Sequence, residues 1–233
     1  LLLIMGAALL PSAATFVIPE PEDIRVLTAE AEAMPPPSGR VYSDLVYTAR
    51  LLGNKKLDLY APLAAYSPGE APLVVFFHGG SWIYGDKVTI RIIDRFLDRM
   101  RRRGYFVASV NYTASITRGL HGPVRNGIRS IRWLRDQASS YGYDADNLAL
   151  YGVSAGAHVA LMSEIAFRHE DSISMVLAEC APSDLVAMAS GEAFEASATL
   201  SYLPEAYLRR FSPVYRVAPS MPPTLIYHGD ADT

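Results

Sequence analysis

Ser154 lies at the centre of the segment GVSAG at residues 152–156, a G-x-S-x-G spacing that can present a nucleophilic hydroxyl. The apolar run at 148–151 predicts a buried strand before it, and a helix is expected directly after it. A strand that turns into a helix within a few residues strains the residue at the tip, so its neighbours must be small. The segment therefore predicts a nucleophile elbow with Ser154 as the nucleophile.

Two groups of backbone N–H donors are expected beside this serine. The N–H of Ala155 would lie in the first turn of the new helix, where unpaired donors and the helix dipole stabilise negative charge. The segment HGGSW at 78–82 follows a continuous apolar run at 73–77, and a glycine-rich loop lets backbone N–H groups approach a ligand closely. Together they predict the two halves of an oxyanion hole.

The elements that must position these groups alternate along the chain. Helix spacing of apolar residues is found at 87–103 and 123–141, and an antiparallel pair of strands is expected to open the sheet. Strand patterns lie at 41–47, 56–60, 73–77, 105–110, 148–151, 175–181 and 222–227. Strands alternating with helices predict an α/β fold with a mainly parallel sheet and helices on both faces. The irregular segment at 184–210 suits a small lid over the acyl pocket, or a plain connecting helix pair.

Composition limits the classes of function. The chain has 233 residues, of which 50% are hydrophobic, and a formal net charge of −3, so a globular domain is expected and nucleic acid is not an expected partner. The single cysteine, Cys180, excludes an intrachain disulfide and a cysteine-based metal site, and its apolar surroundings predict a buried thiol. Without a ligand cluster or a nucleotide-binding glycine loop, we expect no metal and no organic cofactor.

The start of the chain differs from the rest. Residues 1–14 are apolar and end in small residues, which is typical of part of a secretory signal peptide and predicts a secreted or periplasmic protein. A membrane is an expected partner only if this segment is an uncleaved anchor. Residues 15–40 are rich in Pro and Glu and are interpreted as a leader or linker, so the folded domain is expected at 41–233.

Three motifs occur in order on successive predicted strands, namely HGGSW, GVSAGAH and the terminal HGDAD. On these motifs, residues 41–233 resemble the α/β-hydrolase fold carboxylesterase/lipase family, and more closely its hormone-sensitive-lipase-like and bacterial feruloyl-esterase-like branch. The resemblance implies Ser154 as nucleophile, Asp232 as catalytic acid, and an oxyanion hole formed by the backbone of Gly80, Ser81 and Ala155. Asp230 is the competing carboxylate for the acid role.

The chain also departs from the family pattern. Ser81 replaces the third glycine of the loop, Thr113 stands where relatives commonly have Arg, and Asn126 where they often have Asp. The family's triad histidine lies downstream of the acid, and this sequence ends one residue after Asp232. We therefore expect an incomplete domain, truncated at the C-terminus, whose triad histidine is absent from this chain.

The five histidines present are expected to have structural roles, because the triad order in this fold is Ser, then Asp, then His. They are His78, His121, His158, His169 and His228. The resemblance implies a serine hydrolase that cleaves carboxylic esters through an acyl-enzyme, acting on small-molecule esters with short acyl chains or small aromatic groups. An amidase or formamidase, and a catalytically inactive binding protein of the same fold, remain as alternatives.

Overall fold

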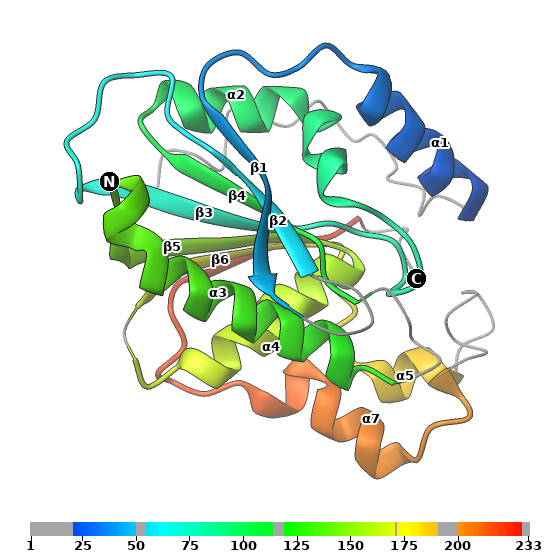
Figure 1. Ribbon diagram of the computed structural model, residues 1–233. Coiled ribbons are helices and arrows are strands. Elements are labelled where there is room, and N and C mark those ends of the chain that lie inside the picture. The colour runs from blue at the N-terminus through cyan, green and yellow to red at the C-terminus, as the bar shows by residue number, and fades with distance from the viewer. Residues whose placement is uncertain (1–20, 50–54, 114–118, 171, 191–199, 230–233) are drawn as a thin grey trace.

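The computed structural model describes residues 21–49, 55–113, 119–170, 172–190 and 200–229, and Figure 1 shows a central sheet with helices packed on it. The predicted signal segment at 1–14 lies outside the described residues. The strands are β1 Val41–Thr48, β2 Lys55–Tyr60, β3 Ala71–Phe77, β4 Phe106–Val110, β5 Tyr143–Val153, β6 Ile173–Glu179 and β7 Thr224–Tyr227. The helices are α1 Pro21–Ala33, η2 Lys87–Arg91, α2 Asp94–Arg102, α3 His121–Tyr141, α4 Ala155–Phe167, α5 Leu185–Ser190, α7 Glu205–Phe211 and η4 Pro213–Arg216.

The strand order is β1-β2-β4-β3-β5-β6-β7. β1 pairs with β2, and β2 with β4, in the antiparallel sense, whereas the remaining neighbours are parallel. The expected opening antiparallel pair and the mainly parallel sheet are both confirmed. Because β3, β5, β6 and β7 are parallel, their carboxyl ends meet at one edge of the sheet, and the residues after them lie close together.

Both faces of the sheet are covered, which explains the continuous apolar run of β3. Leu73, Val75 and Phe77 pack into the cluster with α3 and α4, while Val74 and Phe76 pack into the cluster with α2. This alternation follows from the period of two along a strand. Figure 1 shows α3 and α4 on one face and α2 on the other.

The helix predicted at 87–103 is two helices, so that prediction was wrong in one respect. A 3₁₀ helix, η2, ends at Arg91, and Ile93 has a non-helical backbone (φ −79°, ψ 47°) before α2 begins. Five of the six residues at 88–93 are β-branched, and such residues lower the propensity to form an α-helix. Asp86 caps η2 by accepting a hydrogen bond from Val88 N–H (2.9 Å), which favours the short tight turn.

Part of the predicted leader is folded, because α1 lies within it. Ala31 on this helix is buried, and the Arg91 guanidinium donates hydrogen bonds to the carbonyl oxygens of Met34 and Pro35. This helix was not predicted, because the sequence of the segment has no sustained apolar period. Its contacts with η2 attach the segment to the domain.

The segment predicted as a lid, 184–210, contains α5 and most of α7, and residues 191–199 lie outside the described part. Leu185, Leu200 and Leu208 are buried against the α3/α4 side of the core. Phe211 at the end of α7 is also buried. The helical fragments therefore pack on the domain, and the lid role stays a prediction.

Glu164 is an unexpected charge-bearing residue inside α4. Its side chain is 1% exposed, and neither carboxylate oxygen has a hydrogen-bond partner among the described residues. Burial raises the pKa of Glu164 to about 7, although the charge of Arg168 acts in the opposite direction. The folded protein therefore loses stability as this carboxyl group ionises.

Replacing Glu164 by Gln is expected to stabilise the protein at pH 8. An unfolded glutamate ionises near pH 4.5 and the folded one near pH 7, so its contribution to the free energy of unfolding falls as pH rises between these values. Glu164→Gln should raise the free energy of unfolding at pH 8 by roughly 1–3 kcal/mol and change it little at pH 4. Urea unfolding at both pH values measures this, with exposed Glu32→Gln as control, and a destabilised Glu164→Gln at pH 8 would contradict the assignment.

Candidate active site

Ser154 occupies a strained turn between β5 and α4. Its backbone angles are φ 52° and ψ −120°, outside the regions that L-residues ordinarily adopt. The Ser154 N–H donates to the Glu179 carbonyl oxygen at the end of β6 (2.7 Å), and the Ser154 carbonyl oxygen accepts from His158 N–H in the first turn of α4 (3.1 Å). These two bonds hold the strained residue, as expected of a nucleophile elbow.

The two glycines of the motif are required by close packing. A Cβ atom on Gly152 would overlap with the Gly156 carbonyl group, and a Cβ atom on Gly156 would overlap with the carbonyl oxygens of Phe77 and His78. The elbow thus packs backbone against backbone on the end of β3. This contact is the physical reason for the spacing of the motif.

The loop after β3 lies beside the elbow. A Cβ atom on Gly79 would be 3.7 Å from Ser154 Cβ, so the two segments are in contact. Gly80, Ser81 and Trp82 all have positive φ angles, of 121°, 52° and 57°. The Gly80 carbonyl oxygen accepts from the N–H groups of Ile83 and Tyr84 (2.8 and 2.9 Å), which closes the turn.

The backbone N–H groups of Gly80, Ser81 and Ala155 make no hydrogen bond to any residue in the described ranges. Gly80 and Ser81 are in the loop after β3, and Ala155 is the first residue of α4. Unpaired amides at a helix start and in a tight loop are suited to bind an oxyanion. The structure places the loop after β3 in contact with Ser154, and Ala155 follows the serine directly, whereas the oxyanion-hole role of the three residues stays a prediction.

His78 is buried at the base of the loop. Its Nδ1–H donates to the Gly79 carbonyl oxygen (2.7 Å), which assigns the proton to Nδ1. Its ring stacks on the Tyr112 ring, with 4.4 Å between the ring centroids. Tyr112 Oη–H donates to the His78 carbonyl oxygen (2.7 Å). Burial lowers the pKa of His78, so its imidazole is held neutral.

His158 joins three segments of the site. Its Nδ1 accepts from the Trp82 indole N–H (3.2 Å), and its Nε2–H donates to the Phe211 carbonyl oxygen (2.7 Å). These bonds connect the loop after β3, helix α4 and the end of α7. Both ring nitrogens are engaged and the side chain is fully buried, so His158 supports the site and is not positioned as a base for Ser154.

A polar cluster fixes the far end of the same loop. Asn111 Nδ2 donates to Asp86 Oδ2 (2.6 Å), Lys87 N–H donates to Asn111 Oδ1 (2.6 Å), and Lys87 Nζ donates to Asp58 (2.9 Å). Burial lowers the pKa of Lys87, but its bonds to Asp58 and Asp44 outweigh this effect and raise it. This support was not predicted from the sequence, although Asn111, a polar residue directly after a buried strand, was the available signal.

Two departures from the family pattern contact each other. Thr113 Oγ1–H donates to Asn126 Oδ1 (2.6 Å), and Thr113 N–H donates to the same atom (3.2 Å). Asn126 is buried. The two residues at which the sequence departs from the expected family pattern thus form a neutral hydrogen-bonded pair in this chain.

Asp230 and Asp232 lie outside the described residues. β7, which ends just before them, pairs in parallel with β6 so that Tyr227 is opposite Glu179. Glu179 is the residue that binds Ser154 N–H, so β5, β6 and β7 end at the same edge of the sheet. Of the predicted catalytic pair, the structure describes Ser154 alone.

Cys180, the predicted buried thiol, is 5% exposed.

Among the described residues, there is no group of three or more His, Cys, Asp or Glu side chains that could hold a metal ion. Within those same ranges, every helix is too short or too polar to cross a membrane.

Comparison with known proteins identifies relatives of the chain. The family model BD-FAE matches residues 57–233. The chain is 32% identical over 131 residues to an arylesterase of Saccharolobus solfataricus, covering 55% of this chain and 42% of the relative. It is 32% identical over 123 residues to a probable isoprenylcysteine alpha-carbonyl methylesterase of rice, Oryza sativa subsp. japonica, covering 53% and 27%. The chain thus spans less than half the length of these curated relatives.

Solved structures share the architecture. Esterase B from Lactobacillus rhamnosis superposes with a TM-score of 0.72 at 21% identity, covering 88% of this chain and 71% of that one. LAE6, an alpha/beta hydrolase from the metagenome of Lake Arreo, gives a TM-score of 0.68 at 24% identity, covering 88% and 68%. These similarities confirm the expected α/β-hydrolase fold.

The His158 bridge should make stability depend on pH. Burial lowers the pKa of His158 to about 4, from 6.5 in an unfolded chain, so the unfolded state binds more protons between these values. The free energy of unfolding should therefore fall as pH drops from 6.5 to 4, by up to about 1.4 kcal/mol per pH unit from this group. His158→Gln should reduce that slope in urea unfolding.

Exposed His169 provides the matched control, because His169→Gln removes an imidazole without touching the bridge. The control should keep the pH slope of the wild type. Equal slopes in all three proteins would contradict the assignment of a neutral, bridging His158.

Proposed function

Since this chain belongs to the BD-FAE family, we propose that it is a serine hydrolase that cleaves carboxylic esters through an acyl-enzyme. The observation that supports this most strongly is the strained Ser154 turn with unpaired N–H groups beside it. Holding a residue in such a conformation costs about 1–3 kcal/mol, a cost that is typical of functional sites.

In the proposed reaction, the Ser154 hydroxyl attacks the carbonyl carbon of the ester and the carbonyl oxygen becomes an oxyanion. The N–H groups of Ala155, Gly80 and Ser81 donate hydrogen bonds to it, and the N-terminus of α4 adds the positive end of its dipole. Collapse of this intermediate releases the alcohol and leaves an acyl group on Ser154. Water then attacks the acyl-enzyme, releases the carboxylic acid and restores the hydroxyl.

A base must take the proton from Ser154 and pass it to the leaving alcohol. His78 and His158 are buried with their protonated nitrogens bonded to carbonyl oxygens, so neither suits this task. We assign the role to a histidine downstream of Asp232, with Asp232 orienting it and stabilising its charged form, as the family order implies. Asp230 is the alternative acid.

For the substrate, we propose an ester with a short acyl chain or a small aromatic group. An arylesterase and a methylesterase among the relatives support the ester class. Trp82 and Tyr112, two aromatic residues near the site, are buried in the core and hold the loop, so they do not line an acyl pocket. Faster turnover of a long-chain ester than of a butyrate ester would contradict the short-chain part of the proposal.

Hydrolysis of p-nitrophenyl acetate and butyrate by the full-length protein tests the reaction. Ser154→Ala removes the nucleophile and should lower kcat/KM by at least about 10³-fold while the protein stays folded. Ser190→Ala, which changes an exposed serine on α5, should keep the wild-type rate.

Two results would overturn the proposal. If Ser154→Ala retained wild-type turnover, Ser154 would not be the nucleophile. If the folded wild-type protein hydrolysed an anilide or formamide analogue but no ester, the amidase alternative would replace it, and no turnover of either class would favour a binding protein.

A further inference from the structure

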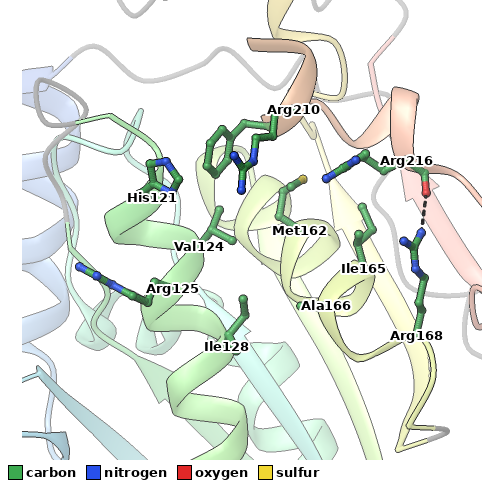
Figure 2. Close-up of a pocket in the computed structure, with 11 residues that line it drawn as sticks. His121, Val124, Arg125, Ile128, Met162, Ile165, Ala166, Arg168, Arg210 and Arg216 are labelled. Carbon is green, nitrogen blue, oxygen red and sulfur yellow. Dashed lines mark hydrogen bonds between the residues drawn. The ribbon is translucent and has the colours of Figure 1, made fainter. Parts of the chain in front are cut away.

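A groove lies between α3 and α4, and the segment from α7 to η4 closes one side of it (Figure 2). Its volume is about 350 Å³, which is within the range of about 300–1,000 Å³ of small-molecule sites. On α4 the groove is lined by Met162, Ile165 and Ala166 in the second half of the helix, and Arg168 lines it just after the helix ends. Ser154 and the oxyanion loop do not line it, so it is separate from the proposed active site.

The floor of the groove is apolar because of the helix spacing. Val124 and Ile128 are one turn apart on α3, and Met162 and Ile165 are one turn apart on α4, so both pairs face the space between the helices. Phe211 contributes an aromatic surface from the end of α7. Such a floor suits an alkyl chain or an aromatic ring.

The rim carries positive charge. Figure 2 shows the guanidinium groups of Arg210 and Arg216 directed toward Met162 from two sides, whereas Arg125 points away from them. Arg168 is also on the rim, where its Nη1 donates to the Arg216 carbonyl oxygen (3.4 Å). No Asp or Glu is among the described residues that line the groove.

Two exposed carboxylates on or next to α4 and α7 are already paired, and Glu164 on α4 is buried with no hydrogen-bond partner among the described residues. Glu205 forms an ion pair with Arg209 (2.7 Å), and Glu170 with Arg135 (2.6 Å). Within the described ranges, Arg210 and Arg216 have no carboxylate partner. Two unneutralised guanidinium groups above an apolar floor are complementary to a molecule that has an anionic head and an apolar body.

We propose that this groove binds a small amphipathic carboxylate, with its carboxylate held by Arg210 and Arg216 and its chain or ring on Met162 and Ile165. Arginine suits the head group because its planar fork binds both carboxylate oxygens. An acid with an alkyl tail and one with an aromatic ring share this chemistry, so both are used as probes. The site does not depend on Ser154 chemistry, and its failure would leave the proposed hydrolysis intact.

Isothermal titration of the full-length Ser154→Ala protein tests the proposal with four probes. Octanoate and 3-phenylpropanoate combine charge with an apolar body, 1-octanol lacks the charge, and inorganic phosphate lacks the apolar body. At least one of the two carboxylates should bind, and more tightly than both 1-octanol and phosphate by tenfold or more. Arg210→Gln/Arg216→Gln should weaken that binding at least tenfold.

The matched control is Arg95→Gln/Arg103→Gln, which removes two exposed arginines at α2 on the opposite face of the sheet and causes the same change in net charge. It should keep the affinity of the parent protein. Three results would each overturn the proposal. The two double variants could bind the carboxylate equally tightly, 1-octanol or phosphate alone could bind tightly, or neither carboxylate could bind.

Discussion

The close contact between the elbow and the end of β3 is the constraint on which the site depends. Gly156 lies so near the carbonyl oxygens of Phe77 and His78 that no side chain fits there. This contact places the start of α4 directly against the loop that leaves β3. It therefore brings the loop that contains Gly80 and Ser81 next to Ser154 and Ala155, and the close backbone packing holds Ser154 in its strained conformation.

Around this contact, hydrogen bonds of buried and partly buried polar groups hold the loop at both ends. His158 accepts from Trp82 and donates to Phe211, so one neutral imidazole links the loop, α4 and α7. At the other end, Asn111 binds both Asp86 and the Lys87 backbone. Hydrogen-bonded networks of this kind give rigidity, which the proposed oxyanion hole needs because its donors must be in place before charge develops.

Much of this arrangement could be predicted from the sequence because the signals were local. The GVSAG spacing predicted the elbow, and the apolar run of β3 predicted a strand covered on both faces. The break between η2 and α2 was missed because it depends on capping by Asp86 and on crowding by β-branched residues. The pairing of Thr113 with Asn126 and of Trp82 with His158 depends on long-range packing, which no local pattern reports.

The central claim is that Ser154 is a nucleophile whose turn and surrounding amides stabilise a tetrahedral intermediate. Phosphonate esters react covalently with activated serines and mimic that intermediate. We would treat the full-length protein with a p-nitrophenyl alkylphosphonate and locate the adduct by peptide mass spectrometry. The account predicts one adduct, on Ser154, formed with loss of p-nitrophenol. A folded protein that remained unlabelled, or that carried the label on another residue, would contradict it.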